Sequence, residues 1–212
     1  MVPWRLRASW RSWRERLFLW RWRRKIGAAR FARFGARSLV VAPRGILNPH
    51  RIEIGDRVLI HEGAMFSVVE EFNGRRHQPR LRIGDDTNIG TGIWFSCVGD
   101  IEIGPSNLMG HNVLIADSYH EYHDPDTPII RQPMAEPKAV KIGPGCIIGP
   151  HAAILAGVSV GRNTFIAANA VLTKSVPDNS VVVGNPARVI RRYDRERGEW
   201  VETDGTGGAL PT

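Results

Sequence analysis

The feature that most constrains this chain is a six-residue spacing of aliphatic residues, usually followed by a small residue, that begins near Val40. The longest run keeps this spacing without a slip through Ile142, Ile148, Ile154, Val160, Ile166 and Leu172. Such a period matches neither the roughly 3.6 residues of a helical turn nor the two-residue alternation of an amphipathic strand. It is typical of short strands joined by turns, three to a coil, stacked into a triangular prism.

Three shorter runs repeat the pattern: Ile54, Ile60 and Phe66; Ile83, Ile89 and Phe95; Ile103, Met109 and Ile115. Each aliphatic residue is predicted to point inward and to stack on its equivalent 18 residues later, in the next coil. A second inward position, mostly small, follows four residues after many of them: Val58, Ala64, Val113, Cys146, Ala152, Val158, Thr164 and Ala170. Because each coil buries its core only against its neighbours, the pattern predicts a solenoid. A sandwich or barrel would show alternation and varied turn spacing instead.

The charge of the chain is concentrated at its N-terminus. Residues 1–34 contain eleven arginines and lysines and a single acid, Glu15, whereas the whole 212-residue chain has a net charge of +8. Residues 1–34 therefore carry +10 and the remainder carries −2, so the basicity belongs to an N-terminal arm, assigned to residues 1–35.

This arm is predicted to be an amphipathic helix. Its apolar stripe is formed by Leu6, Trp10, Trp13, Leu17 and Trp20, with arginines on most other faces. Two interpretations remain open: a helix packed on the domain or on a neighbouring subunit, and a helix lying on an anionic membrane surface. Nucleic-acid binding is not favoured, because no recognised nucleic-acid module accompanies the arm.

The repeat domain is assigned to residues 36–192, with loop insertions near 67–82 and 117–140 where the spacing is lost. Insertions in solenoids commonly form the binding face. Residues 193–212 lose the period and are expected to be a tail with a disordered end. No apolar run is long enough to span a bilayer and no secretory signal is evident, so we expect a cytoplasmic protein, with peripheral attachment at the inner face of the membrane as a further hypothesis. Cys97 and Cys146 lie inside apolar patterns and are interpreted as buried thiols.

Three features together resemble the hexapeptide-repeat acyltransferases, and most closely the branch that acetylates sugars of surface polysaccharides. They are the unbroken hexads, the Asp117-x-x-His120 insertion followed by Asp124 and Pro128-Ile129, and the ending from Leu172 to Arg191. The resemblance covers residues 40–192 and implies an all-β, left-handed parallel β-helix that assembles into homotrimers. It also implies active sites at subunit interfaces, with acetyl-CoA as the acyl donor and no metal.

The resemblance assigns roles to individual positions. His120 falls where the family has its catalytic histidine; Ala168 falls beside the pantetheine, and Lys174, Arg188 and Arg191 match residues near the cofactor. Pro150 stands where some members offer a backbone N–H to the thioester oxygen, and proline lacks that donor, so Gly149 or another nearby amide is expected to replace it. The remaining candidates are Asp117, to orient the imidazole or bind the acceptor, and Trp94 and Tyr119, to contact a sugar.

This residue set favours direct transfer of an acetyl group from acetyl-CoA to a hydroxyl of a sugar or glycan precursor. Histidine can take the acceptor proton near neutral pH, and a thioester is already activated, so no covalent enzyme intermediate is required. Two alternatives stay open. One is a γ-class carbonic-anhydrase-like zinc protein using His111, His120, His123 or His151; the other is a non-catalytic β-helix scaffold.

Overall fold

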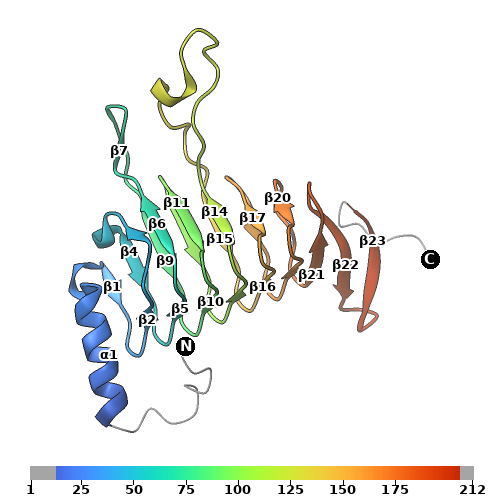
Figure 1. Ribbon diagram of the computed structural model, residues 1–212. Helices are drawn as coiled ribbons and strands as arrows, with labels where there is room; N and C mark the ends of the chain where they lie inside the picture. Colours follow the sequence, from blue (N-terminus) through green and yellow to red (C-terminus); the bar gives the residue numbers. More distant parts are fainter. Residues whose placement is uncertain (1–12, 206–212) are drawn as a thin grey trace.

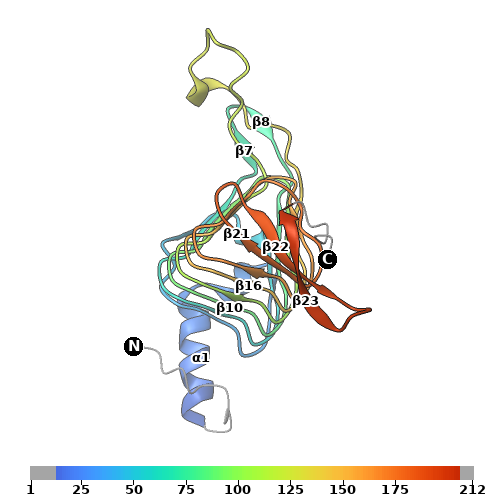
Figure 2. The same cartoon turned by 90° about the vertical axis from the view of Figure 1, so that its right-hand side faces the viewer.

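A computed structural model of the chain describes residues 13–205. These residues form a triangular prism whose three sides are parallel sheets, here named A, B and C (Figures 1 and 2). Sheet A contains β1 (Arg33–Phe34), β4 (Ile52–Ile54), β9 (Arg80–Ile83), β12 (Asp100–Ile103), β15 (Val140–Ile142) and β18 (Ser159–Val160). Sheet C contains β3 (Gly45–Ile46), β6 (Met65–Val68), β11 (Trp94–Cys97), β14 (Leu114–Ala116), β17 (Ala153–Ile154) and β20 (Val171–Leu172).

Sheet B is the longest side. Its parallel part contains β2 (Leu39–Val40), β5 (Leu59–Ile60), β10 (Asn88–Ile89), β13 (Leu108–Met109), β16 (Ile147–Ile148), β19 (Phe165–Ile166) and β21 (Ser180–Val183). Two antiparallel strands, β22 (Arg188–Asp194) and β23 (Glu199–Gly205), continue it. The fold class expected from the hexads, an all-β left-handed parallel β-helix, is confirmed.

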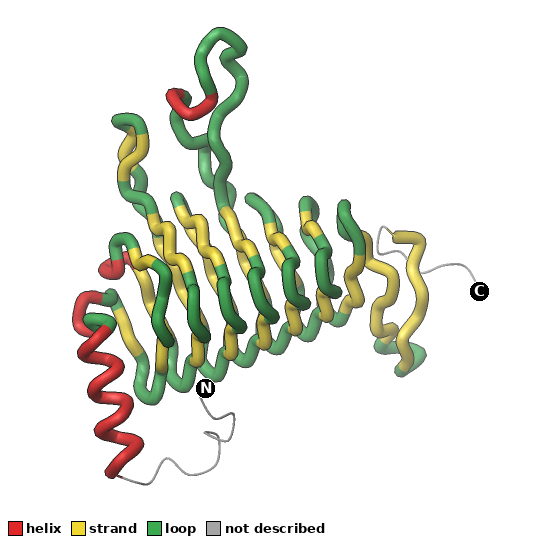
Figure 3. Tube along the Cα trace, in the orientation of Figure 1, coloured by secondary structure: helices red, strands yellow, loops and turns green. Residues whose placement is uncertain are grey.

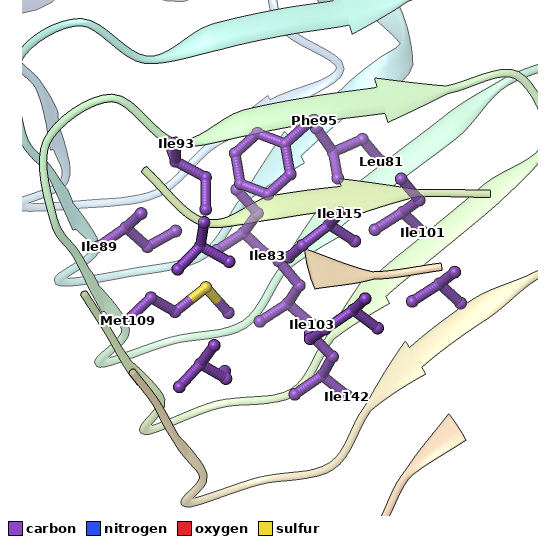
Figure 4. Packing of buried hydrophobic residues seen from close by; sticks show 14 of the residues in the cluster. Leu81, Ile83, Ile89, Ile93, Phe95, Ile101, Ile103, Met109, Ile115 and Ile142 are labelled. Atoms are coloured by element: carbon purple, nitrogen blue, oxygen red, sulfur yellow. The ribbon is translucent and has the colours of Figure 1, made fainter. Parts of the chain in front are cut away.

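The core is a column of the hexad side chains inside the prism (Figure 4). Ile83, Ile103 and Ile142 come from successive coils of sheet A and are each at most 3 % exposed. Phe66 and Phe95, from successive coils of sheet C, are fully buried with their ring centroids 5.3 Å apart. All eight of the predicted second inward positions are buried as well. The six-residue spacing therefore identifies the inward-facing residues correctly.

The predicted 18-residue stacking is correct only for the coils between residues 140 and 172, and the final pairing, Phe165 with Val181, spans 16 residues. Lys141 pairs with Ser159, 18 residues later, but Arg82 pairs with Glu102, 20 residues later. The two additional residues lie at the corner between sheets C and A, where the step from Phe95 to Ile103 is eight residues and includes a further buried residue, Ile101. The strands on the two sides of this corner, β11 and β12, are each four residues long, and this accounts for the longer coil.

The predicted limits of the first insertion and of the arm also need correction. Ser67 and Val68 still belong to β6, and the chain leaves the prism only after them, into a hairpin of β7 (Glu71–Phe72) and β8 (Arg75–Arg76). The second insertion, residues 117–139, is a long loop with a 3-10 turn at Ile129–Arg131. Both project from the corner between sheets C and A (Figure 3). At the N-terminus, β1 begins at Arg33, so the β-helix starts inside the segment assigned to the arm.

The arm contains helix α1 (Trp13–Lys25) and a short 3-10 turn at Ala28–Arg30. A second 3-10 turn, at Pro49–Arg51, follows the first coil of the β-helix. Arg23 fixes the helix to the first coil, because its guanidinium donates to Gly35 O and Phe34 O and lies 4.7 Å from the centre of the Phe34 ring. Leu17 and Trp20 of the predicted stripe are exposed, at 46 % and 55 %. Leu6 and Trp10 lie outside the described residues. No helix within residues 13–205 has the length and apolarity needed to cross a bilayer.

The C-terminal segment is more ordered than its sequence suggests. The assignment of residues from 193 onward to a tail is wrong as far as Gly205, because β22 and β23 form an antiparallel pair that extends sheet B. Tyr193 packs edge-on against Trp200, with ring centroids 5.7 Å apart. This ribbon covers the last coil, whose core would otherwise be open to solvent. Residues 206–212, where a disordered end was expected, lie outside the described part.

Candidate active site

His120 lies at the base of the long loop, where the outgoing and returning segments pair with each other. It forms a β-bridge with Met134, flanked by hydrogen bonds from Glu121 N to Pro133 O (3.0 Å) and from Ala135 N to Tyr119 O (2.8 Å). The imidazole is exposed, and its ring packs edge-on against Phe72 of the β7–β8 hairpin, with centroids 5.0 Å apart. A backbone fixed on both sides and one aromatic wall leave the histidine ring accessible to a ligand.

The hairpin holds the loop at four further points. Asn73 Nδ2 donates to Ile130 O (2.9 Å) and to Gln132 O (3.0 Å). Arg75 donates to Met134 O and forms an ion pair with Glu136. The two insertions, which leave the prism from different coils, therefore form one unit.

The loop also has an internal clasp. The amide of Gln132, which is 5 % exposed, donates to Asp124 O and Thr127 O, and its oxygen accepts from Asp124 N. Hydrogen bonds from the Thr127 side chain and the Asp126 amide lower the pKa of Asp124, so this carboxylate closes the turn that it begins.

Three further aromatic or imidazole side chains of the loop face solvent. His123 Nδ1 lies 2.6 Å from Glu121 Oε2, and Tyr122 stacks on the His123 ring at 4.7 Å. Tyr119, 44 % exposed, lies 5.9 Å from Tyr122. The predicted acceptor contact Tyr119 therefore belongs to an exposed aromatic cluster beside His120.

Asp117 has a role that differs from the predicted one. It is fully buried, and its two carboxylate oxygens accept hydrogen bonds from the backbone N–H groups of Val98 and Gly99, both at 2.8 Å. Its carboxylate thus stabilises the extended corner between sheets C and A, and it is committed to the backbone rather than to the imidazole of His120. Burial raises its pKa above the ordinary value, while the two N–H donors act in the opposite direction.

The predicted cofactor residues Gly149 and Ala168 lie on one edge of the prism, between sheets B and C. A Cβ atom on Gly149 would lie 2.4 Å from Ala168 N, so the glycine permits the close stacking of two coils. The expectation that Gly149 offers its amide to a thioester is wrong, because that N–H donates to Ile166 O at 2.8 Å. The neighbouring amide is also occupied, since His151 N donates to His111 O.

The three predicted basic residues are spread over the last coil. Arg188 and Arg191 are exposed on β22, and Arg191 pairs with Val181 on the outer side of sheet B. The turn before Arg188 stacks on the edge that carries Ala168, because Ala187 N and Gly184 O both bond to Val171. Lys174 follows β20 and lies at the opposite end of sheet C, so it is not on this edge.

Trp94 is likewise separated from the loop within one chain. It begins β11, and it pairs with Leu114 of β14, whereas Tyr119 and His120 lie beyond the far end of β14. Six residues separate Leu114 from His120, and an extended strand rises about 3.3 Å per residue. Trp94, which lies beside Leu114, is therefore far from His120 along sheet C. The Trp94 ring is 50 % exposed and donates to Ser67 Oγ.

The two cysteines lie in the core and are free. Burial raises the pKa of both thiols, which removes their nucleophilic form at neutral pH. Within residues 13–205, no cluster of three histidine, cysteine or acidic side chains could hold a metal in a single chain.

Phe72, Asn73 and Gln132 were not predicted as part of the site. The Asn73-Gly74 pair is a strong signal for a two-residue hairpin turn and could have located the hairpin. Nothing in the sequence pairs that hairpin with a loop more than 50 residues away.

Comparison with known proteins matches the repeat and the fold. Residues 139–174 match the family described as bacterial transferase hexapeptide (six repeats). A "Probable acetyltransferase" of Mycobacterium tuberculosis is 32 % identical over 69 % of this chain and 53 % of its own length. WbbJ of Escherichia coli, named as a lipopolysaccharide biosynthesis O-acetyl transferase, is 30 % identical over 55 % of this chain and 62 % of its own length. The chain thus spans between half and two thirds of these two relatives.

Two solved structures share the architecture. AntD, an N-acyltransferase from Bacillus cereus in complex with dTDP and 3-hydroxybutyryl-CoA, has a TM-score of 0.65 at 20 % identity, covering 82 % of this chain and 90 % of that one. A maltose O-acetyltransferase from Clostridium difficile has a TM-score of 0.55 at 23 % identity, covering 89 % and 80 %. By its repeat, its fold and its relatives, this chain belongs to the hexapeptide-repeat transferase family.

Proposed function

We propose that this protein is a CoA-dependent acyltransferase in which His120 is the general base. The observation that carries the proposal is an exposed imidazole fixed at the base of a braced loop beside a β-helix. The named activities of the relatives, acetyl and acyl transfer, support the same reaction class.

In this proposal, the acceptor hydroxyl loses its proton to His120 as its oxygen attacks the thioester carbonyl. The tetrahedral intermediate collapses by breaking the carbon–sulfur bond, and the CoA thiolate leaves and takes up the proton. The acetyl group is thereby joined to the acceptor oxygen. The buried thiols of Cys97 and Cys146 leave no cysteine available as a nucleophile in the described residues, which favours direct transfer.

CoA is the donor substrate, and the edge between sheets B and C is its proposed site. Ala168 is exposed there, and Arg188 lies where the next turn stacks on the same edge. Guanidinium groups bind phosphate oxygens with two parallel hydrogen bonds, so Arg188 and Arg191 are assigned to the phosphates. Lys174, beyond the opposite end of sheet C, would reach CoA bound to a neighbouring subunit.

A homotrimer is proposed as the working assembly, with each active site between two subunits. The outer faces of the three sheets differ in chemistry. Sheet A displays a row of alternating charge, including Glu53, Arg82 and Glu102. Sheet B instead displays an apolar row formed by Leu108, Ile147 and Phe165, each more than 40 % exposed. An exposed apolar row of this kind is the surface that subunit association would bury.

For the acceptor, we propose a sugar or glycan hydroxyl. The exposed aromatic side chains of Trp94 and Tyr119 suit stacking on a sugar ring, and the name of WbbJ points to a polysaccharide precursor. The location proposed for the reaction is the cytoplasm, at the inner face of the membrane.

The attachment to the membrane would be made by α1 and the residues before it. Leu17 and Trp20 are exposed on this helix, as are Arg21, Arg24 and Lys25, and the Arg24 guanidinium lies over the Trp20 ring. Tryptophan and arginine side chains suit the interface of an anionic bilayer. Vesicles with anionic lipid should retain the full chain but not the double variant Leu17→Ser and Trp20→Ser, while neutral vesicles should retain neither. Equal retention of both forms on anionic vesicles would refute the attachment.

The experiment that tests the proposed reaction is acceptor-dependent thiol release from acetyl-CoA, measured across sugars, nucleotide sugars and amino acids. The same preparation is titrated with CoA by calorimetry and analysed for zinc. The proposal expects CoA binding, thiol release with at least one acceptor, and no stoichiometric zinc. Zinc near one ion per chain with no CoA binding would favour the carbonic-anhydrase-like reaction; neither CoA nor zinc would favour a scaffold.

A further inference from the structure

We infer that the β7–β8 hairpin is a functional part of the active site, and that Phe72 and Asn73 are positioning residues for His120. This inference rests on the proposed function, because it assigns to the hairpin the task of holding the base of that reaction. The hairpin lies outside the prism and adds nothing to the buried core, so its own fold does not explain its presence (Figures 1 and 3).

The turn of the hairpin has a constrained geometry. Asn73 and Gly74 both have positive φ, at 46° and 77°, as a type I′ hairpin turn requires. Such a turn has little freedom, so it can hold a side chain at a fixed place. The side chain it holds, the Asn73 amide, donates to two carbonyl groups of the loop.

The contacts of the hairpin fall on one segment of the long loop. Asn73 bonds to Ile130 and Gln132, and Arg75 bonds to Met134, so the hairpin fixes the returning segment of the loop. Met134 is the bridge partner of His120. The backbone of the histidine is therefore held through the very segment that the hairpin fixes.

The imidazole of His120 also contacts the hairpin directly. Phe72, immediately before the turn, contacts the His120 ring at an interplanar angle of 69°. An aromatic ring in this arrangement attracts the partner ring, and the contact limits rotation of the partner about its side-chain bonds. Phe72 thus restricts the ring orientation, while Asn73 restricts the backbone.

Two variants separate these tasks from the folding of the hairpin. Asn73→Asp keeps a residue that the turn accepts, but it replaces the donor with a carboxylate facing two carbonyl oxygens. Phe72→Leu keeps an apolar side chain without a ring, and Phe72→Tyr restores the ring. Arg76→Ala is the matched control, because Arg76 is on the same hairpin, is 90 % exposed and has only a 3.7 Å ion pair with Glu71.

The experiment measures hydrogen exchange of residues 119–135, together with kcat and KM for acetyl-CoA. We expect faster exchange in Asn73→Asp and a kcat lower by about ten- to a hundredfold in Asn73→Asp and Phe72→Leu, since small displacements of a catalytic group have effects of this size. KM for acetyl-CoA should stay within about twofold, Phe72→Tyr should recover most of kcat, and Arg76→Ala should match wild type.

Different results refute the proposed function and the role of the hairpin. A wild-type protein without acyl transfer would refute the proposed function, whereas the exchange data would still report whether the hairpin holds the loop. If wild type is active, an unchanged kcat in Asn73→Asp and Phe72→Leu would overturn the inference, whether or not exchange is faster. A lower kcat in Asn73→Asp with unchanged exchange would overturn it too, because the effect would not pass through the loop.

Discussion

At the scale of single residues, the edges of the prism depend on the absence of a side chain. Gly149 shows this most clearly, since a Cβ atom there would meet backbone atoms of Ala168 that cannot move without shifting a whole coil. The residue assigned from family resemblance to the cofactor is therefore also required by the packing of two coils.

Replacement of Gly149 by alanine should lower the free energy of unfolding by about 1–3 kcal/mol, the usual cost of overpacking. Gly45→Ala is the control, because a Cβ atom there meets mainly the flexible end of the Met65 side chain. Urea denaturation of both variants measures the difference. Equal stability of the two would show that the coils separate easily at this edge.

Asp117 illustrates how a buried carboxylate links the fold to pH. Because its pKa is raised in the folded protein, the folded state keeps the proton to a higher pH than the unfolded chain does. Its contribution to stability is therefore greatest below the ordinary value of 3.8, and it falls as the pH rises from there through the raised pKa.

The variant Asp117→Asn should lack this dependence. The stability of wild type minus that of the variant, from urea denaturation at a series of pH values, should decrease as the pH rises above about 4 and then level off. A difference that grows with pH over the same range would mean that ionised Asp117 is favoured by the fold, contrary to the effect of burial.

At the scale of elements, the strands of the prism could be predicted from the sequence, whereas the longer corner and the antiparallel ribbon could not. A hexad reports which side chains point inward, so Ile142 to Leu172 could be placed from the sequence alone. The corner that adds two residues was missed, because Ile101 and Ile103 satisfy the inward pattern equally well. The antiparallel ribbon that begins at Arg188 has no six-residue period, and its pairing depends on contacts with the last coil.

The outer row of sheet B supports a prediction about assembly. Phe165→Glu should convert the proposed trimer to monomers, because an unpaired carboxylate buried in an apolar interface costs several kcal/mol. Ser159→Glu is the control, as it places the same charge on the outer row of sheet A beside Lys141. Light scattering after size-exclusion chromatography gives the mass of each. A Phe165→Glu variant that remains trimeric would move the subunit contact to another face.

At the scale of the whole molecule, the chain combines a repetitive prism with two insertions that depart from the repeat. The sequence indicated where the insertions interrupt the repeat and which of them holds the histidine. It did not indicate that the two contact each other, since the contacts are made by ordinary asparagine, arginine and phenylalanine side chains. These contacts form because the stacking of coils brings residues 73 and 130 to the same corner.

The same stacking explains why the residues assigned to the cofactor do not all lie together in one chain. Gly149 and Ala168 are one coil apart and share an edge, whereas Lys174 and Trp94 lie elsewhere on the surface. Residues separated within one chain can meet across a subunit boundary, and this is the arrangement that the proposed trimer requires.

The most direct test of the central claim compares His120→Ala with His123→Ala in the acetyl-CoA thiol-release assay. Both histidines are exposed in the same loop, and both side chains have a contact there, His120 with Phe72 and His123 with Glu121, so His123→Ala controls for the loss of such a contact. Loss of a general base should lower kcat of His120→Ala by about 10²- to 10⁴-fold with the Kd for CoA unchanged, and His123→Ala should stay within a few-fold of wild type. Wild-type turnover in His120→Ala would contradict the account, because the base would then have to lie elsewhere.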